Sequence, residues 1–233
     1  MLKIERTVLP SADQWDIVIE GMRNPKNSWD RSDSFACGKE CNYPFCDDQH
    51  NCDGEHVLGN NDYDLMVRLA HGGSVHAKYR RMLPVWVTIS APLYWWKEFD
   101  QYKVGTVSNS CSTMHKIHAK EFTLDDFSCE HLNYVSGDRI ESLDILYDVL
   151  AMMNCYRELY VTAKDEGRHD DAKKHWWQMI QLLPTSYNQK RTVMVNYEVL
   201  VNMYRDRKNH KLDEWHTLCD WIESLPHSDL ITG

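Results

Sequence analysis

Four of the eight cysteines gather in one short polar stretch, CGKECNYPFCDDQHNC, which has the side-chain chemistry of a metal site. Thiolates and imidazoles at this density can hold Zn²⁺, which prefers four such ligands in tetrahedral geometry. The spacing C-x3-C-x4-C-x5-C, however, differs from the C-x2-C pairs of common zinc knuckles. Two interpretations therefore stay open: a polar loop with free thiols in a reducing compartment, or a zinc site formed by Cys37, Cys41, Cys46 and Cys52.

A second stretch that could do chemistry, NSCSTMHK, follows Gly105 and is rich in hydroxyl and amide groups. Small polar side chains leave backbone N–H groups accessible, and such groups can wrap a phosphate. The hydroxyls of Ser110, Ser112 and Thr113 would add further donors. Serine and asparagine are also common residues of surface turns. The sequence thus predicts a loop that either binds a nucleotide phosphate or is a plain surface turn.

The charge distribution favours a small anionic ligand over nucleic acid. The chain has 26 Lys and Arg against 35 Asp and Glu, so its net charge is 26 − 35 = −9 and its overall field repels a phosphate backbone. Basic residues are nevertheless concentrated in Lys78–Lys103 and Lys190–Lys211, which could line one anion-binding cleft. No apolar run approaches the ~20 residues of a membrane helix. With no evident secretory signal, we expect a soluble, cytoplasmic protein.

Hydrophobic periodicity predicts an α+β chain with strands in the first half and long helices in the second. Strands are expected over Leu2–Val8 and Val85–Ser90, and a capping box of Ser11 and Gln14 starts the first helix. Further helices are expected over Tyr63–Ala70, Leu93–Tyr102, Ile140–Tyr156, Ala172–Leu182, Val193–Tyr204 and Leu212–Ile222. We expect residues 1–233 to form a single domain, with a cysteine-rich polar insertion at about 30–60.

Two segments together resemble the flavin-dependent thymidylate synthase (ThyX) family. The first segment is APLYWWKEFDQYKVGTVSNSCSTMHKI, and it stands where the family carries the motif R-H-R-x-x-S-x-N-E-x-S-x-R-Y. The second segment is LLPTSYNQKRTVMVNYEVLVNMYRDRKNH, and it stands where the family carries L-P, N-x-R and a further Arg. The resemblance implies that family's α+β fold, with an antiparallel sheet packed against long helices. It also implies bound FAD, NADPH and methylenetetrahydrofolate as co-substrates, reductive methylation of dUMP or a related pyrimidine nucleotide, and a homotetramer with sites at subunit interfaces.

The flavin-contacting residues of the family carry over only in part. Counting without gaps from Pro92, the Arg-His-Arg triplet falls on Gln101, Tyr102 and Lys103, so that Lys103 alone keeps a charge for the flavin pyrophosphate. The same counting places the flavin-contacting His on His76. The resemblance therefore implies a weakened pyrophosphate site.

Two more cofactor positions come from other parts of the resemblance. Ser34, in RSDSF, stands where the family has the serine of an upstream flavin contact. Counting forward from Pro184, the Asn of N-x-R falls on Asn196 and its Arg falls on Glu198. A carboxylate at the latter position would repel a phosphate that an arginine holds elsewhere in the family.

Substrate-binding residues follow from the same alignment. The later arginine, which contacts uracil in the family, falls on Arg207. An arginine there could donate to charge that develops on a pyrimidine oxygen, and we name it as a catalytic candidate. Alternatively, Arg207 faces water beside Asp206, or pairs with Glu198 in the core. The remaining substrate-binding candidates are Ser108, Asn109, Cys111, Ser112 and Thr113.

Cys111 adds a possibility that the family pattern lacks. A thiolate that faces the pyrimidine could add to C6, provided that His115 or Lys103 lowers its pKa. A lone cysteine in a loop is more commonly inert.

Two rival functions stay open beside the flavin-dependent synthase. One is a nucleotide-binding or regulatory protein that kept the fold and lost the flavin. The other is a pyrimidine-modifying enzyme with altered one-carbon chemistry. The substitutions at Gln101, Tyr102 and Glu198 are the sequence features that raise these alternatives.

Overall fold

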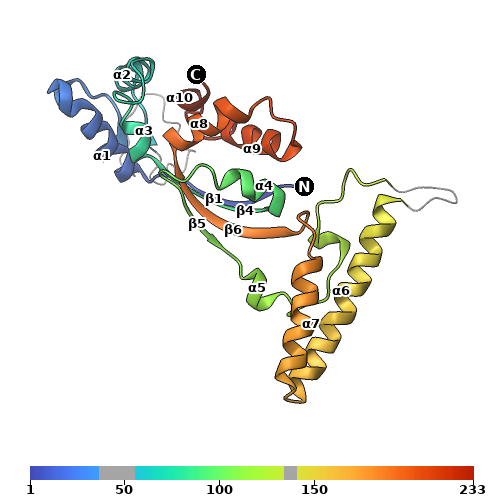
Figure 1. Cartoon of the computed structure of the whole chain (residues 1–233). Helices are drawn as coiled ribbons and strands as arrows, with labels where there is room; N and C mark the ends of the chain where they lie inside the picture. The colour runs from blue at the N-terminus through green and yellow to red at the C-terminus, as the bar shows by residue number, and fades with distance from the viewer. Residues whose placement is uncertain (37–55, 134–140) are drawn as a thin grey trace, which may run out of the picture. The chain divides into compact units, whose positions relative to one another are not determined.

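The structure is a computed structural model, and it describes residues 1–36, 56–133 and 141–233. It confirms the α+β class, with helices and a four-stranded sheet of order β1-β4-β6-β5 (Figure 1). Its strands are β1 (Lys3–Val8), β4 (Pro84–Pro92), β5 (Val107–Ser110) and β6 (Asn188–Asn196). Residue contacts divide the chain into two compact units, and each of these strands passes from one unit into the other. The single domain stays a prediction.

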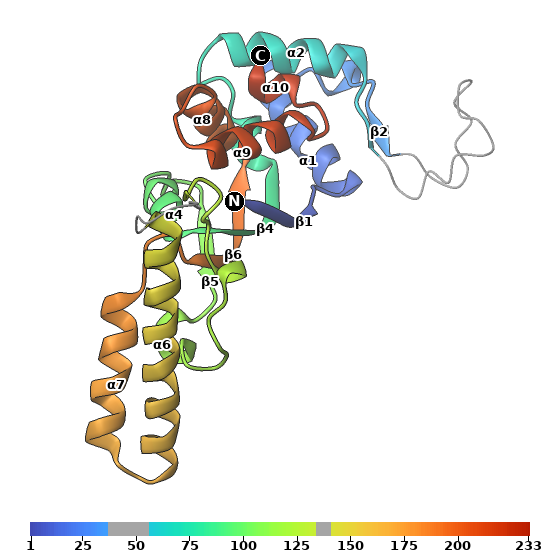
Figure 2. The same cartoon turned by 90° about the vertical axis from the view of Figure 1, so that its right-hand side faces the viewer.

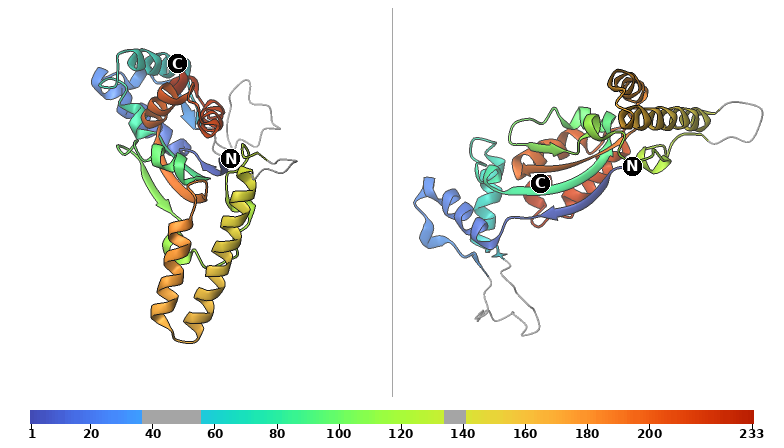
Figure 3. Two further views of the ribbon diagram at one scale, coloured as in Figure 1. Left: turned by 45° about the vertical axis from the view of Figure 1, so that its right-hand side comes forward. Right: turned by 90° about the horizontal axis from the view of Figure 1, so that it is seen from below.

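β4 and β6 are the central strands and run antiparallel. The N–H of Leu93 donates to the carbonyl of Tyr187 (3.0 Å) after β4 ends, and the N–H of Tyr197 donates to the carbonyl of Leu83 (3.1 Å) after β6 ends. Along β4 the predicted alternation is confirmed, because every second side chain is buried. Figure 3 shows β1 lying beside β4.

Two segments differ from the prediction. The stretch after Gly105 is not a loop throughout, because Val107–Ser110 forms β5 and pairs with β6. Val193 was predicted to begin a helix, but it is buried in β6, and helix α8 (Tyr197–Arg207) begins only after Asn196. Pairing with strands on both sides outweighs the helical spacing of Val193 and Tyr197, since strand formation depends on neighbouring strands.

The first unit comprises Met1–Glu5, Ile89–Gln101 and Asn109–Thr192. Its helices are α4 (Leu93–Phe99), α5 (Thr113–Lys116), the 3-10 turn η3 (Leu124–Asp126), α6 (Ser142–Asp165) and α7 (His169–Leu182). α6 and α7 lie side by side as a helical hairpin (Figure 2). Gly167, with φ +72°, adopts the left-handed turn that ends the first arm. The hairpin core contains Ile117, Phe122, Phe127, Leu146, Leu150, Met153 and Met179.

The second unit comprises Arg6–Thr88, Tyr102–Ser108 and Val193–Gly233. Its elements are α1 (Ala12–Arg23), η1 (Asn24–Lys26), η2 (Trp29–Arg31), β2 (Phe35–Ala36), β3 (His56–Val57), α2 (Asn60–His71), α3 (Tyr79–Met82), α8, α9 (Asp213–Glu223) and α10 (Asp229–Thr232). The predicted capping box is confirmed, with Gln14 N donating to Ser11 Oγ at 3.3 Å and Ser11 N donating to Gln14 Oε1 at 2.9 Å. None of the described helices could span a membrane.

The buried carboxylate of Asp62 joins α1 and α2 to the segment that precedes β2. Its Oδ1 accepts from Arg23 Nε, and its Oδ2 accepts from the hydroxyls of Ser32 (2.8 Å) and Ser34 (2.7 Å) and from the backbone N–H groups of Asp33 and Ser34. Burial acts to raise the pKa of Asp62, but the hydrogen bonds from Ser34, Ser32, Arg23 and Asp33 outweigh it and lower that pKa below 3.8. Asp62 is therefore ionised in the folded protein at neutral pH.

We predict that Asp62→Asn destabilises the protein by about 3–5 kcal/mol at neutral pH, because it leaves buried Arg23 without its counter-charge. Since the folded-state pKa is lowered, the stability from Asp62 is present above its ordinary pKa and is lost as the pH falls below it. Urea unfolding from neutral to acidic pH measures both effects. The exposed pair of Asp171 with Lys174 is the control, and Asp171→Asn should leave the midpoint unchanged. Equal midpoints for the two variants would contradict the role of Asp62.

Candidate functional site

Arg207, at the end of α8, is held between two aromatic side chains. Its Nε donates to Tyr102 Oη at 3.0 Å, and the Tyr102 hydroxyl donates to Asp206 Oδ2 at 3.5 Å. Its guanidinium lies 4.9 Å from the ring centroid of Trp215 and 5.8 Å from that of Tyr102. We call Tyr102, Arg207 and Trp215 the arginine cluster. The interpretation of Arg207 as a merely solvated residue is wrong, because its side chain is half-buried and engaged.

The segment Tyr102–Ser108 runs beside α8. Asn196 caps the helix, accepting from Val199 N at 3.0 Å. Gly105, with φ +82°, lies close to Asn196, because a Cβ at this glycine would stand only 2.8 Å from Asn196 Nδ2. Tyr102 contacts Arg207 at the other end, about 16 Å from Asn196 along a helix that rises 1.5 Å per residue. The two sequence motifs of the resemblance therefore meet along α8, although Asn196 and Arg207 lie at opposite ends.

The cluster provides a cation in a fixed orientation. Burial raises the pKa of Tyr102 more than Arg207 lowers it, so the phenol stays protonated at neutral pH and keeps its link to Asp206. The hydrogen bond and the ring faces together fix the plane of the guanidinium. A preorganised arginine of this kind suits a planar carbonyl or a phosphate oxygen.

Only some of the residues at the predicted flavin-contacting positions are suited to bind a flavin. Gln101 and Lys103 are both exposed. Tyr102, at the middle position of the triplet, is committed to Arg207. Glu198 has a buried carboxylate oxygen with no hydrogen-bond partner, at the position of a family arginine. Of the three triplet positions, Lys103 thus carries the one cation for a pyrophosphate, and Glu198 adds a negative charge where the family has a positive one.

Ser34 and His76 are not brought to the arginine cluster by any described contact. Ser34 Oγ donates to Asp62 and accepts from Gly59 N at 2.9 Å, so its hydroxyl is used for structure. His76 is exposed and lines a separate cavity of about 320 Å³ together with Lys78 and Tyr79. Their cofactor roles stay predictions, and the hydroxyl of Ser34 is already engaged.

The stretch expected to wrap a phosphate is partly committed to the sheet. Ser108 and Asn109 are exposed residues of β5, and Cys111 N donates to the carbonyl of Lys190 at 2.9 Å. Cys111 and Ser112 have exposed side chains, whereas Thr113 is buried and its Oγ1 accepts from Gln189 Nε2 at 2.9 Å. The amide of Cys111 is therefore not available to a ligand. The substrate-binding role of these residues stays a prediction.

A polar network in the first unit was missed by the sequence analysis. Arg191 Nε donates to Gln189 Oε1 at 2.9 Å, and its NH1 donates to Asp100 Oδ1 at 2.7 Å. The guanidinium lies 4.3 Å from the ring centroid of Trp96, whose Nε1 donates to the carbonyl of Gln189 at 2.8 Å. Alternation along β6 could have placed Arg191 on one face with Gln189, but nothing in the sequence links either residue to Asp100 or Trp96.

The two basic segments do meet, as predicted. Arg80 from one segment and Arg205 and Lys208 from the other line one cavity of about 420 Å³ in the second unit, with Tyr63 and His71. Anion binding in this cavity stays a prediction.

The proposed zinc ligands Cys37, Cys41, Cys46 and Cys52 lie outside the described residues. Within the part of the chain that the structure describes, no group of three or more His, Cys, Asp or Glu side chains could hold a metal ion. The metal site therefore stays a hypothesis about the cysteine-rich stretch alone.

The fold that carries these residues is the fold of flavin-dependent thymidylate synthases. ThyX from Helicobacter pylori, in a crystal structure with FAD and dUMP, matches 99% of this chain and 97% of that chain with a TM-score of 0.60 at 16% identity. A second such structure of the Helicobacter pylori protein gives 0.58 at 15% identity, over 100% and 96% of the two chains. No family model matches the sequence, and no curated protein matches it significantly.

A second kind of protein shares this fold. The UMP/dUMP methylase PolB from Streptomyces cacaoi, bound with 5-Br dUMP, gives a TM-score of 0.53 at 12% identity, over 100% of this chain and 94% of that chain. At these identities the likeness is one of fold. It confirms the resemblance that the two sequence motifs predicted.

We predict that Arg207→Ala lowers the stability of the ligand-free protein by about 1–2 kcal/mol, since it removes a hydrogen bond and a cation–π contact. Tyr102→Phe should cost about 1 kcal/mol, because it removes the hydroxyl alone. Arg205→Ala is the matched control, because Arg205 lies on the same helix, is exposed and, within the described part of the chain, forms an ion pair with its neighbour Asp206. Denaturant unfolding checks this order, and equal losses for Arg205→Ala and Arg207→Ala would refute it.

Proposed function

We propose that this protein is a divergent flavin-dependent thymidylate synthase homologue that acts on a pyrimidine deoxynucleotide, dUMP or a related compound. The observation that carries the proposal is the position of Arg207. Two motifs matched by sequence counting meet along α8, and they set this arginine in a fixed orientation within a chain of matching fold. The reaction would be the reductive methylation of the pyrimidine or a related one-carbon modification.

Arg207 would bind and polarise the pyrimidine. A guanidinium held by Tyr102 and Trp215 needs little reorganisation when a carbonyl oxygen gains negative charge, so it can stabilise that charge. The phenol of Tyr102 would orient the guanidinium through its hydrogen bond and would not itself touch the substrate. Cys111, exposed directly after β5, would be the nucleophile that adds to C6 of the pyrimidine.

The cofactor part of the proposal rests on the resemblance. FAD, when bound, would supply the hydride, with NADPH and methylenetetrahydrofolate as co-substrates. Lys103 would be the cation for its pyrophosphate, and the resemblance implies Gln101 and Asn196 as further cofactor contacts. Free thiols among the described residues fit a reducing cytoplasm, which we propose as the compartment.

The unpartnered carboxylate oxygen of Glu198 favours a second candidate function. An anion at this position opposes a flavin phosphate, while Arg207 keeps its fixed geometry. A nucleotide-binding or regulatory protein that kept the fold and lost the flavin would have this combination of residues.

Titration of the purified, assembled protein with dUMP and with FAD tests the proposal. We expect Arg207→Ala to weaken dUMP binding by about 2–3 kcal/mol, because an arginine donor to a ligand oxygen is lost. Lys97→Ala, which removes an exposed cation of α4, should leave the affinity unchanged. Wild-type protein that does not bind dUMP, or an equal loss of affinity through Lys97→Ala, would overturn the substrate assignment.

The same samples separate the two candidate functions. A yellow protein, or one that takes up added FAD and loses that affinity in Lys103→Ala but not in Lys97→Ala, supports the flavoenzyme. A colourless protein that binds dUMP and ignores FAD supports the regulatory candidate.

The proposed homotetramer has support from the surface of α6. Ile145, Met152 and Leu159 recur at intervals of seven residues and are exposed by 55%, 48% and 42%. Apolar residues at this interval form the seam between packed helices. We propose that a second copy of the chain covers this face.

Sedimentation should therefore give a tetramer for the wild-type protein and a smaller species for Ile145→Asp with Met152→Asp. The charge would be buried in the seam, which is unfavourable. Lys173→Asp, on the exposed surface of α7, is the control and should remain tetrameric. A monomeric wild-type protein would exclude the interface.

A further inference from the structure

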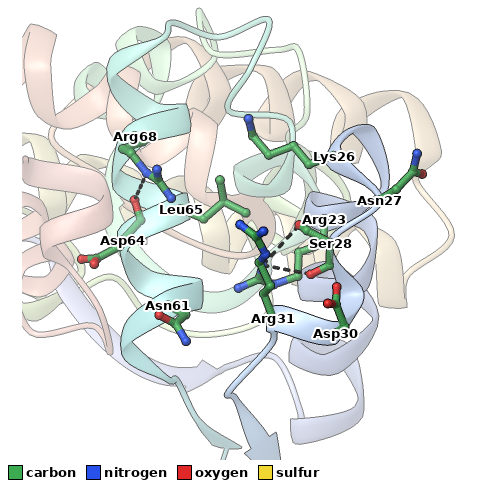
Figure 4. A pocket seen from close by; sticks show the side chains of 10 residues that line it. All are labelled: Arg23, Lys26, Asn27, Ser28, Asp30, Arg31, Asn61, Asp64, Leu65 and Arg68. Atoms are coloured by element: carbon green, nitrogen blue, oxygen red, sulfur yellow. Dashed lines mark hydrogen bonds between the residues drawn. The ribbon is translucent and has the colours of Figure 1, made fainter.

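A second basic cavity lies in the second unit, between the end of α1 with the turns η1 and η2 on one side and α2 on the other (Figure 4). Its volume is about 730 Å³. Neither of the two basic segments identified in the sequence contributes to it. Its cations are Arg23, Lys26, Arg31 and Arg68.

The cavity is positive in a chain that is negative as a whole. Four cations and the two carboxylates of Asp30 and Asp64 line it, which gives 4 − 2 = +2, or +1 when Asp62 behind Arg23 is included. The whole chain carries −9. A concentrated positive field in a concave surface attracts small anions.

Arg23 gives the cavity an unsatisfied donor. Its side chain is only 3% exposed, Nε donates to Asp62, and NH1 donates to the carbonyl (3.1 Å) and hydroxyl (3.3 Å) of Ser28. The remaining nitrogen, NH2, is buried and has no hydrogen-bond partner. A buried guanidinium nitrogen without an acceptor is unfavourable, so a ligand oxygen at this position would satisfy it.

Asp62 is not placed to supply that acceptor. Its Oδ1 is engaged by Arg23 Nε, and its Oδ2 already accepts hydrogen bonds from Ser32, Asp33 and Ser34. Turning the carboxylate toward NH2 would break this set. The unpaired nitrogen is therefore a fixed property of the fold around Asp62.

The lining also restricts the class of ligand. Among the described residues that line it, Leu65 is the single large apolar side chain, and none has an aromatic ring on which a nucleobase could stack. Three exposed cations, Lys26, Arg31 and Arg68, surround the buried one, an arrangement suited to several anionic oxygens at once. We propose that this cavity binds a polyphosphate group, either free or as the tail of a nucleoside triphosphate. This inference is independent of the proposed function.

Calorimetric titration of the full chain with inorganic tripolyphosphate tests the proposal. We expect saturable binding, weakened about tenfold or more by Arg31→Ala with Arg68→Ala, because two charge-assisted contacts are lost. Lys26→Glu, a second and independent variant, should weaken binding similarly. The matched control is Lys97→Ala with Lys211→Ala, which removes two exposed cations outside the cavity and should leave the affinity unchanged.

Further arms of the experiment identify the source of the phosphate. Equal affinities for tripolyphosphate and ATP indicate that the phosphate group alone is recognised, and tighter binding of ATP indicates a nucleoside triphosphate. No saturable binding of either, an equal loss in the control pair, or tighter binding of a single-stranded oligonucleotide would overturn the proposal.

Discussion

The ion pair of Arg23 with Asp62 is the constraint on which much of the second unit depends. Asp62 draws together the end of α1, the start of α2 and the residues before β2. Ser34 forms hydrogen bonds with both Asp62 and Gly59 N, so it joins the segment before the cysteine-rich stretch to the segment after it. One consequence is that two guanidinium nitrogens of Arg23 form hydrogen bonds and the third has no acceptor. The neighbouring cavity is therefore lined by an arginine with an unused hydrogen-bond donor.

Elements encoded by local patterns could be predicted, and those that depend on distant partners could not. The capping box at Ser11 and the alternation of Val85–Ser90 are properties of a few neighbouring residues, and the structure confirms both. β5 has the sequence VSNS and an entirely exposed pattern, so nothing local marks it as a strand. It exists because β6 supplies its hydrogen-bonding partner.

In the candidate site, too, some features could be predicted from the sequence, and others depend on distant partners. Counting from Pro184 selected Arg207, and the structure places it against the segment that carries the other motif. The partners that hold it are Tyr102 and Trp215, and counting from Pro92 had placed Tyr102 at the middle of the family's flavin-contacting triplet. Arg191 and Arg23 escaped notice because their partners, Asp100 and Asp62, lie 91 and 39 residues away. Sequence spacing identifies a cation, but only the fold identifies its counter-charge.

The interleaving of the two units along the chain has a consequence for synthesis on the ribosome. The second unit needs Arg6–Thr88, Tyr102–Ser108 and Val193–Gly233, so it cannot be completed until residues 193–233 have emerged. The α6–α7 hairpin, in contrast, is built from neighbouring residues and can form while the chain is still growing. Until β6 is synthesised, the edge of β4 that pairs with β6 in the folded sheet is exposed. This strand edge of the nascent chain can pair with other chains.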